Sequence, residues 1–303
     1  MRLCGLTLLE RLVRQHLQAG AERIIVRGEG LPSLPSLGVP VEVLAPRAAL
    51  PEGALVTPGD EFLGIKVVDS VSRRRAERSL LETCRRPYDG LVDRYVVRYF
   101  SLRLTRFVAM TPLTPNQITV VSILSGLFGA VLAALGHPAI GAMMMVVQVI
   151  LDSIDGELAR LIFKGSHIGM IIDNVGDELV DNAFIAGVGI GFGGPWLVAG
   201  IVGAGLRVVS AGYLYYAMVK VGKDPDPFSF HPWFDDDTTK AYYHDLTPRV
   251  LLRAFIRRDF YTIAWTAFCV TGVGFLVVPW GLAMGIGYAT ILILHFAVMG
   301  KTA

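Results

Sequence analysis

Four aspartates stand close together in the middle of the chain, within stretches that are otherwise strongly apolar. Asp152 and Asp155 are three residues apart, and Asp173 and Asp177 are four apart, so each pair lies on one face of a helix. Converging carboxylates repel one another and would take up protons unless a cation lay between them. All-oxygen ligation favours Mg²⁺, Mn²⁺ or Ca²⁺, and Mg²⁺ commonly completes its shell with substrate phosphates. We therefore predict a Mg²⁺ or Mn²⁺ site that receives a phosphate-bearing substrate.

Two antiparallel helices must position these acids, because the turn at residues 164–166 separates the two pairs. Helical rise counted from Gly165 places all four at overlapping depths, roughly 12 to 20 Å along the helices. Small residues beside the acids leave room for a ligand, although they also suit close helix packing: Gly156, Ala159, Gly169 and Gly176. Arg160 is placed either to bind a diphosphate or to reach lipid headgroups.

The composition of the chain places these helices in a membrane. Of 303 residues, 53% are hydrophobic and 18% are charged, whereas soluble domains carry about 25% charged residues. About 20 apolar residues cross a bilayer, which predicts six transmembrane helices, at 117–136, 139–163, 168–192, 195–219, 260–279 and 281–299. The connections at 137–138, 193–194 and 280–281 lack Lys and Arg. By the positive-inside rule, we expect a protein of the cell inner membrane with both termini and the active site cytosolic.

The segment before the spans is polar and has α/β texture. Residues 6–19 and 70–86 show helical patterns, and residues 22–26 and 41–45 are typical of short strands. The basic amphipathic stretch at 88–110 is expected to lie in the membrane interface, the alternative being an ordinary surface helix. We predict a small cytosolic α/β domain at 1–88, then an all-α integral membrane domain at 89–303, with an interfacial amphipathic helix before its six spans.

Several other classes of function fit the sequence poorly. The net charge of +2 and the lack of a basic run with aromatics argue against nucleic acid as a partner. Three scattered cysteines suit neither a disulfide framework nor a zinc site. Intramembrane acids also mark ion-coupled transporters, but these acids cluster on one hairpin and no inverted repeat is apparent. A noncatalytic scaffold would not need acids at these depths.

The spacing D-x2-D-G-x2-A-R-x8-G-x3-D-x3-D at residues 152–177 resembles the signature of the CDP-alcohol phosphotransferase (CDP-alcohol phosphatidyltransferase) family in every fixed position. The similarity extends along residues 90–300 and includes TPLTPNQIT before the first span. It implies a homodimer with a polar cavity open to the cytosol. It also implies metal ligation by Asp152, Asp155 and Asp173, with Asp177 near the metal as general base. Contacts with the CDP moiety are implied for Gly156, Arg160 and Ser166, and less strongly for Asn116 and Thr119.

The reaction implied by this resemblance releases CMP. Asp177 would take a proton from an acceptor hydroxyl, which attacks the donor phosphorus farther from cytidine. The partners would be a CDP-alcohol donor, a polar alcohol or alcohol-phosphate acceptor, and membrane lipids. We favour a donor of the CDP-diacylglycerol type and a phospholipid product, with inositol phosphate among the possible acceptors. The alternative is a soluble inositol phosphodiester made from CDP-inositol.

Further charged residues have two interpretations each. Arg207, about a dozen residues into the fourth span, either binds an acceptor phosphate or pairs with Asp181 or Glu178. Asp181 either holds a neighbouring polar group or lines the cavity, whereas Glu178 lies off the acidic stripe. The remaining candidates bind either acceptor phosphate or lipid headgroups: Arg253, Arg257 and Arg258.

The N-terminal segment weakly resembles part of a sugar-phosphate nucleotidyltransferase. Such a domain precedes the membrane enzyme in one branch of the family, which includes the di-myo-inositol phosphate phosphate synthases, and residues 85–106 resemble the junction in that branch. The Gly-rich nucleotide loop is absent, and Asp60 and Asp69 are unsupported as metal ligands. We therefore expect no cytidylyltransferase activity, but a remnant used for stability, dimer contacts or docking.

Overall fold

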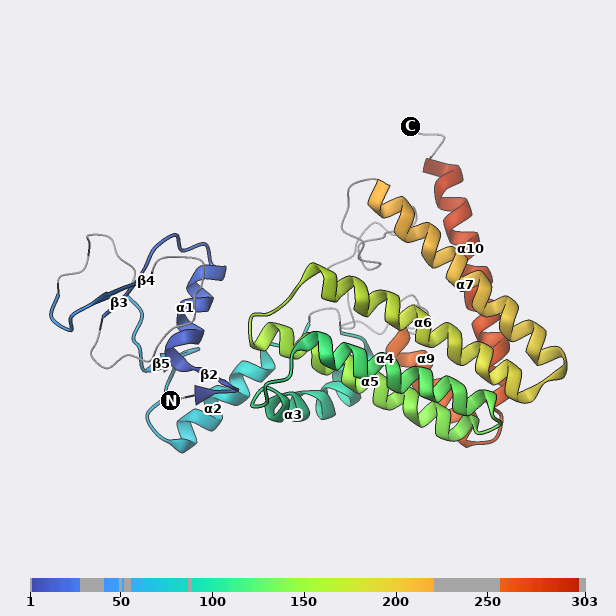
Figure 1. The fold of residues 1–303 in the computed structure, drawn as a ribbon, viewed down its shortest axis with the longest axis horizontal. Coiled ribbons are helices and arrows are strands. Elements are labelled where there is room, and N and C mark those ends of the chain that lie inside the picture. The colour runs from blue at the N-terminus through green and yellow to red at the C-terminus, as the bar shows by residue number, and fades with distance from the viewer. Residues whose placement is uncertain are drawn as a thin grey trace.

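The computed structural model describes residues 2–27, 41–48, 51, 56–86, 89–220 and 257–299. Arg253, one of the acceptor-phosphate candidates, lies outside these ranges. Long helices joined by short turns make up most of the molecule (Figure 1). They are α4 (Pro115–Ala134), α5 (Pro138–Leu161), α6 (His167–Phe192), α7 (Gly194–Lys220), α9 (Arg258–Val270) and α10 (Val277–Met299), with the 3₁₀ segment η3 (Gly274–Leu276) before α10.

Four of the described helical segments are long and apolar enough to cross a membrane. They cover residues 115–134, 138–161, 194–216 and 274–298. Helix α6 differs because four acids interrupt its apolar sequence, and α9 has only 13 residues. The described part of the chain is therefore mostly helical with four candidate membrane spans, and the count of six crossings remains a prediction.

The turn between the last two predicted spans is not where the sequence analysis put it. Trp280 and Gly281 lie inside α10, and the chain turns instead at Gly272, whose φ is +86°. Glycine adopts this left-handed conformation at little steric cost, so it ends α9 efficiently. Pro279 falls in the first turn of α10, where a backbone N–H would have no helical partner anyway. Hydropathy alone does not reveal this break, because both sides of it are apolar.

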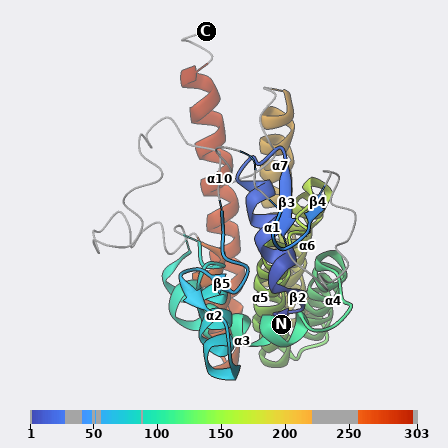
Figure 2. The same ribbon diagram turned by 90° about the vertical axis from the view of Figure 1, so that its left-hand side faces the viewer.

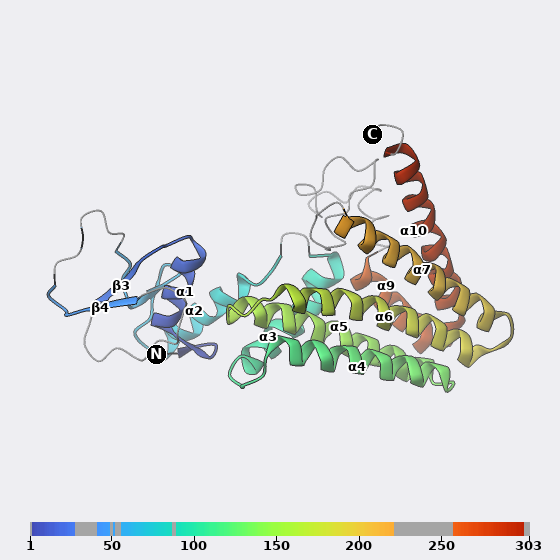
Figure 3. The same cartoon turned by 45° about the horizontal axis from the view of Figure 1, so that its top comes forward.

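The helices pack so that α4 supports both acid-bearing helices. Helix α4 packs along α5 and α6, while α7 packs against α6 and α10 (Figure 3). Helix α5 also contacts α9, but it makes little direct contact with α6. The carboxylates of α5 and α6 therefore face a region that side chains of α4 and α9 border.

The N-terminal segment consists of short strands and two helices. In chain order these are β1 (Arg2–Leu3), β2 (Leu6–Thr7), α1 (Leu8–Gln18), β3 (Ile24–Arg27), β4 (Val41–Leu44), β5 (Glu61–Phe62), β6 (Ile65–Lys66) and α2 (Ser70–Glu82). Strands β3 and β4 pair in parallel, from Ile24 opposite Val41 to Arg27 opposite Leu44, and the other two pairs are antiparallel. Helix α1 begins later than predicted because residues 2–7 form a hairpin. That this segment forms a separate α/β domain remains a prediction.

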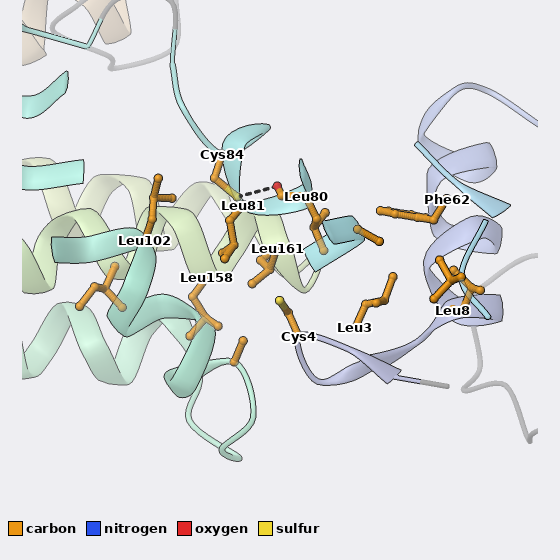
Figure 4. Packing of buried hydrophobic residues seen from close by; sticks show 14 of the residues in the cluster. Leu3, Cys4, Leu8, Phe62, Leu80, Leu81, Cys84, Leu102, Leu158 and Leu161 are labelled. Atoms are coloured by element: carbon orange, nitrogen blue, oxygen red, sulfur yellow. Dashed lines mark hydrogen bonds between the residues drawn. The ribbon is translucent and has the colours of Figure 1, made fainter. Parts of the chain in front are cut away.

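One hydrophobic core joins this segment to the helical bundle. Leu3 and Phe62 belong to the same buried cluster as Leu158 and Leu161 of α5 (Figure 4). The side chain of Arg11 is fully buried and donates hydrogen bonds to the carbonyls of Leu3, Cys4 and Leu161, at 2.7–2.8 Å. The N-terminal elements consequently lie against the end of the bundle where α5 finishes (Figure 2).

A buried polar network attaches a further helix to α5. The π-helical turn η1 (Asp93–Val97) runs into α3 (Arg98–Val108). Arg98 pairs with Asp89 at 2.7 Å and with Glu157 of α5 at 2.6 Å, while Ser101 and Thr105 each donate to Glu157 at 2.6 Å. Burial would raise the pKa of Asp89, but the hydrogen bonds and charge of Arg98 hold that pKa below its usual value.

The exposed face of η1 and α3 is rich in large apolar and aromatic side chains, with Arg94 and Arg103 among them. Its large side chains are Tyr95, Tyr99, Phe100, Leu104 and Phe107. A helix that turns polar groups towards the protein and aromatic groups outwards suits a membrane interface better than water. This arrangement supports the interfacial location, which remains a prediction.

Replacing Gly5 with alanine is expected to loosen the N-terminal segment from the bundle. A Cβ atom at this position would lie 2.1 Å from the carbonyl oxygen of Ala109, and φ is +86°. Gly20 is a matched control, because its φ is +90° but a Cβ atom there meets nothing within 4 Å. Left-handed backbone costs a non-glycine residue about 1–2 kcal/mol. Thermal unfolding in detergent should therefore show a larger decrease in Tm for Gly5→Ala than for Gly20→Ala. Equal decreases in Tm would contradict the close contact between Gly5 and Ala109.

Candidate metal centre and active site

Three of the four predicted acids form a compact group. Asp152 and Asp155 of α5 and Asp173 of α6 each offer one carboxylate oxygen, and these oxygens lie within 4.8 Å of one another. Asp155 is buried, and the Oδ1 atom of Asp173 is buried with no hydrogen-bond partner among the described residues. A buried, unpartnered carboxylate oxygen beside two further carboxylates fits a hard divalent cation. The donor set therefore suits the predicted Mg²⁺ or Mn²⁺.

Helix α4 holds one of these acids in place. The hydroxyl of Thr119 donates to Oδ2 of Asp155 at 2.5 Å, and Thr119 is 4% exposed. Pro115 begins α4, and the preceding Thr114 caps it together with Gln117. The hydroxyl of Thr119 thus lies on a candidate metal ligand, and its contact with CDP stays a prediction.

Asp177 lies beside the group of three, but in a different setting. Its Oδ2 atom pairs with the guanidinium of Arg258, and its Oδ1 accepts a hydrogen bond from Gln148 at 3.1 Å. Arg258 also donates to Gln148 at 2.8 Å and lies 3.7 Å from Asp152. The predicted metal ligand Asp177 is therefore not one of the three grouped carboxylates. Of the arginines considered from sequence that the structure describes, Arg258 is the one that pairs with acids of the signature, Asp152 and Asp177.

A second buried network lies behind Asp177. Asp181 is 1% exposed; it accepts a hydrogen bond from the Tyr261 hydroxyl and lies 3.3 Å from Arg258. Arg207 is 3% exposed and lies 3.6 Å from both Asp181 and Glu178. The structure thus pairs Arg207 with acids, as one of its two interpretations required. Asp181 likewise holds neighbouring polar groups.

Two participants were missed by sequence reasoning. Gln148 connects Asp177 to Arg258, and Tyr261 connects Asp181 to Arg207. Gln148 could have been singled out from the sequence, because it is the one polar residue in the apolar run AIGAMMMVVQVIL. Tyr261 could not have been singled out, because aromatic residues are common in predicted transmembrane spans.

The remaining predicted positions lie around this centre. Ser166 caps α6 by accepting a hydrogen bond from the Gly169 N–H at 3.0 Å, and a Cβ atom on Gly169 would lie 2.8 Å from Oδ1 of Asn116. Ser166, Asn116 and Gly169 therefore meet where α4 and α6 begin. Arg257 instead pairs with Asp259 at 3.1 Å and with Asp93 at 3.7 Å.

Comparison with known families identifies this part of the chain. Residues 112–227 match the sequence model of the CDP-alcohol phosphatidyltransferase family. This region is a CDP-alcohol phosphatidyltransferase domain. All four acids of the signature lie within it, together with Gln148 and Arg207. The resemblance expected from residues 152–177 is confirmed.

Three curated relatives illustrate what this chain is similar to. A "Bifunctional IPC transferase and DIPP synthase" of Aquifex aeolicus is 30% identical over 53% of this chain and 38% of its own length. A protein of the same description from Thermococcus kodakarensis is 37% identical over 37% of this chain and 26% of its own. An "Archaetidylinositol phosphate synthase" of Pyrococcus horikoshii is 30% identical over 36% of this chain and 57% of its own. The chain thus spans less than two thirds of each of these relatives.

Replacing Asp181 with alanine is expected to destabilise the transferase domain strongly. The substitution would deprive the buried Arg207 and the half-buried Arg258 of their shared carboxylate, and removing one partner of a buried pair costs about 3–5 kcal/mol. Thermal unfolding in detergent measures the loss. Glu178→Gln is the control, because Glu178 is 37% exposed and the amide keeps the size and polarity of its side chain. If Tm decreases no more for Asp181→Ala than for Glu178→Gln, Asp181 does not stabilise the buried network around Arg207.

Proposed function

We propose that this chain transfers a phospho-alcohol group from a CDP-alcohol to a hydroxyl of a polar acceptor and releases CMP. The observation that carries the proposal is the placement of Asp177 beside the three grouped carboxylates, within a domain of this family. Such a site presents a cation-binding group and a separate carboxylate to the same substrates.

Asp177 is suited to act as the general base. It would accept the proton of the acceptor hydroxyl, whose oxygen forms a bond to the donor phosphorus farther from cytidine, while the bond from that phosphorus to CMP breaks. Bound at Asp152, Asp155 and Asp173, a Mg²⁺ or Mn²⁺ ion would supply positive charge against the donor diphosphate. The chain itself contributes positioning and electrostatics, which provide most of the catalysis in phosphoryl transfer.

Arg258 favours an acceptor that itself carries a phosphate. Its guanidinium already touches Asp177 and lies near Asp152, so an anionic group bound there would bring a neighbouring hydroxyl towards the base. An inositol phosphate meets this requirement. We therefore propose an alcohol phosphate as acceptor, and we favour phospholipid synthesis from a donor of the CDP-diacylglycerol type.

A second candidate differs in its donor. Four relatives are described as bifunctional IPC transferase and DIPP synthase, which favours CDP-inositol and a soluble inositol phosphodiester product. The relative described as an archaetidylinositol phosphate synthase favours a lipid product. The proposed acceptor contacts at Asp177 and Arg258 are compatible with either donor.

The proposed location is the cell inner membrane, with the active site and both termini on the cytosolic side. The four apolar helices and the exposed aromatic face of α3 support a membrane location. We also propose a homodimer, on the family resemblance. Cross-linking in native membranes would test the dimer independently of activity.

The function is tested with purified full-length protein in detergent. CDP-diacylglycerol and CDP-inositol are each offered with Mg²⁺ or Mn²⁺, against glycerol, inositol, glycerol phosphate and inositol phosphate, while CMP release is followed. We expect metal-dependent CMP release that is fastest with CDP-diacylglycerol and an alcohol phosphate. Release only from CDP-inositol would select the second candidate. No metal-dependent release from any pair would refute both.

A further inference from the structure

Two guanidinium groups from distant parts of the chain converge beside Gly156. A Cβ atom built on Gly156 would lie 3.3 Å from Nη1 of Arg160 and 3.3 Å from Nη2 of Arg86. Arg160 lies one turn farther along α5, whereas Arg86 follows α2 in the N-terminal segment. Both groups lie beside the residue that directly follows Asp155, and arginine is the residue best matched to phosphate, so the arrangement suits a diphosphate bound at this point of α5.

Hydrogen bonds fix the segment that carries Arg86 against α5. Arg160 donates from Nη2 to the carbonyl of Cys84 at 3.1 Å, and the backbone N–H of Arg86 donates to Asp89 at 3.1 Å. Asp89 is in turn held by Arg98, which binds Glu157, the residue directly after Gly156. The position of Arg86 is therefore set by a buried network that ends on the metal-bearing helix.

Hydrophobic packing fixes the same junction. Leu80 and Leu81 of α2 belong to one buried cluster with Leu158 and Leu161 of α5, and Figure 4 shows these side chains gathered at the end of both helices. The sulfur of Cys84 lies 4.0 Å from the carbonyl oxygen of Glu157. Arg86 therefore follows a helix end that is packed and hydrogen-bonded to α5, not a free tail.

We propose that Arg86 is a donor-binding residue, contributed by the N-terminal segment, which binds the donor diphosphate together with Arg160. This inference rests on the proposed function. Gly156 directly follows Asp155, so phosphate oxygens directed at the carboxylate group come within reach of both guanidiniums. Arg160 Nε is buried with no hydrogen-bond partner among the described residues, which leaves it a donor to offer. The missing side chain of Gly156 leaves space for the phosphate.

This arrangement gives the N-terminal segment a function that needs no nucleotidyltransferase chemistry. The segment would complete the donor site through one arginine, and the core that it shares with α5 would hold that arginine in register.

The test is binding of CDP to the full-length protein in detergent, measured by calorimetry with Mn²⁺ present. Arg86→Ala is expected to weaken CDP binding about tenfold or more, as the loss of a charge-assisted hydrogen bond does. Arg85→Ala is the matched control, because Arg85 is the adjacent arginine and pairs with Glu82 at 2.6 Å. It should bind CDP as the unmodified protein does. Mn²⁺ binding without nucleotide should be unchanged in both variants.

A second variant covers the case in which alanine disturbs folding. Arg86→Gln keeps the length and polarity of the side chain but removes its charge, so it should also bind CDP more weakly while unfolding at the normal temperature. Equal CDP affinity of Arg86→Gln and Arg85→Ala would overturn the role of Arg86 and leave the proposed function intact. Failure of the unmodified protein to bind CDP would overturn the function and this inference together.

Discussion

Replacing Asp177 with asparagine is expected to lower the rate of CMP release by about 10²- to 10⁴-fold, the usual contribution of a general base. Asparagine keeps the size of the side chain and still accepts a hydrogen bond, but it cannot take the proton of the acceptor hydroxyl. The three carboxylates grouped by geometry do not include Asp177, so Mn²⁺ binding should persist in the variant. Turnover is measured as CMP release, and metal binding is measured from the electron paramagnetic resonance signal of free Mn²⁺.

The control for this experiment is Glu178→Gln. Glu178 follows Asp177 on the same helix but is 37% exposed and pairs with Arg207 rather than with Arg258. Its substitution should change the rate by only a few-fold. The loss in Asp177→Asn should also persist at saturating metal, because the missing function is proton acceptance. Full activity of Asp177→Asn would remove its assignment as the base.

Replacing Asp152 with asparagine is expected to weaken Mn²⁺ binding by more than about 100-fold. Groups that merely orient metal ligands contribute 10- to 100-fold to affinity, and a direct carboxylate ligand contributes at least as much. The variant leaves two of the three grouped carboxylates. Mn²⁺ titration of the purified protein measures the change directly.

The response of activity to added Mn²⁺ distinguishes Asp152→Asn from Asp177→Asn. Millimolar Mn²⁺ should restore part of the activity of Asp152→Asn, because the base is intact, but none of that of Asp177→Asn. Asp69→Asn is a suitable control, because Asp69 is an exposed helix cap remote from the site in sequence. Normal Mn²⁺ affinity in Asp152→Asn would show that the ion, if bound, is held elsewhere.

Much of the site was predictable from the sequence, because it depends on local periodicity. Spacings of three and four residues put Asp152 with Asp155 and Asp173 with Asp177 on helix faces, and a short turn made the two helices consecutive. The grouping of three of these acids agrees with that expectation. The turn at Gly272 was misplaced, since nothing in apolar sequence on both sides distinguished it from the Trp280–Gly281 pair.

Partners across long sequence separations were not predictable. Arg207 had two interpretations, and only the packing of α6 against α7 placed it 3.6 Å from Asp181. The three arginines at 253, 257 and 258 were equivalent by composition. Only the position of α9 against α5 separated Arg258, on the acids, from Arg257, which pairs with Asp93.

The sequence by itself determined the apolar helices and the acidic stripes, and it predicted the class of cation that oxygen ligands favour, because each of these follows from residue type and helical period. Only the tertiary structure decided which side chains meet: Arg258 with Asp177, Glu157 with Arg98, and Arg86 with Arg160 beside Gly156. The reason is physical. A charge buried in an apolar bundle must find an opposite charge or a polar partner, but several candidates satisfy that need, and the choice among them is made by how the helices pack.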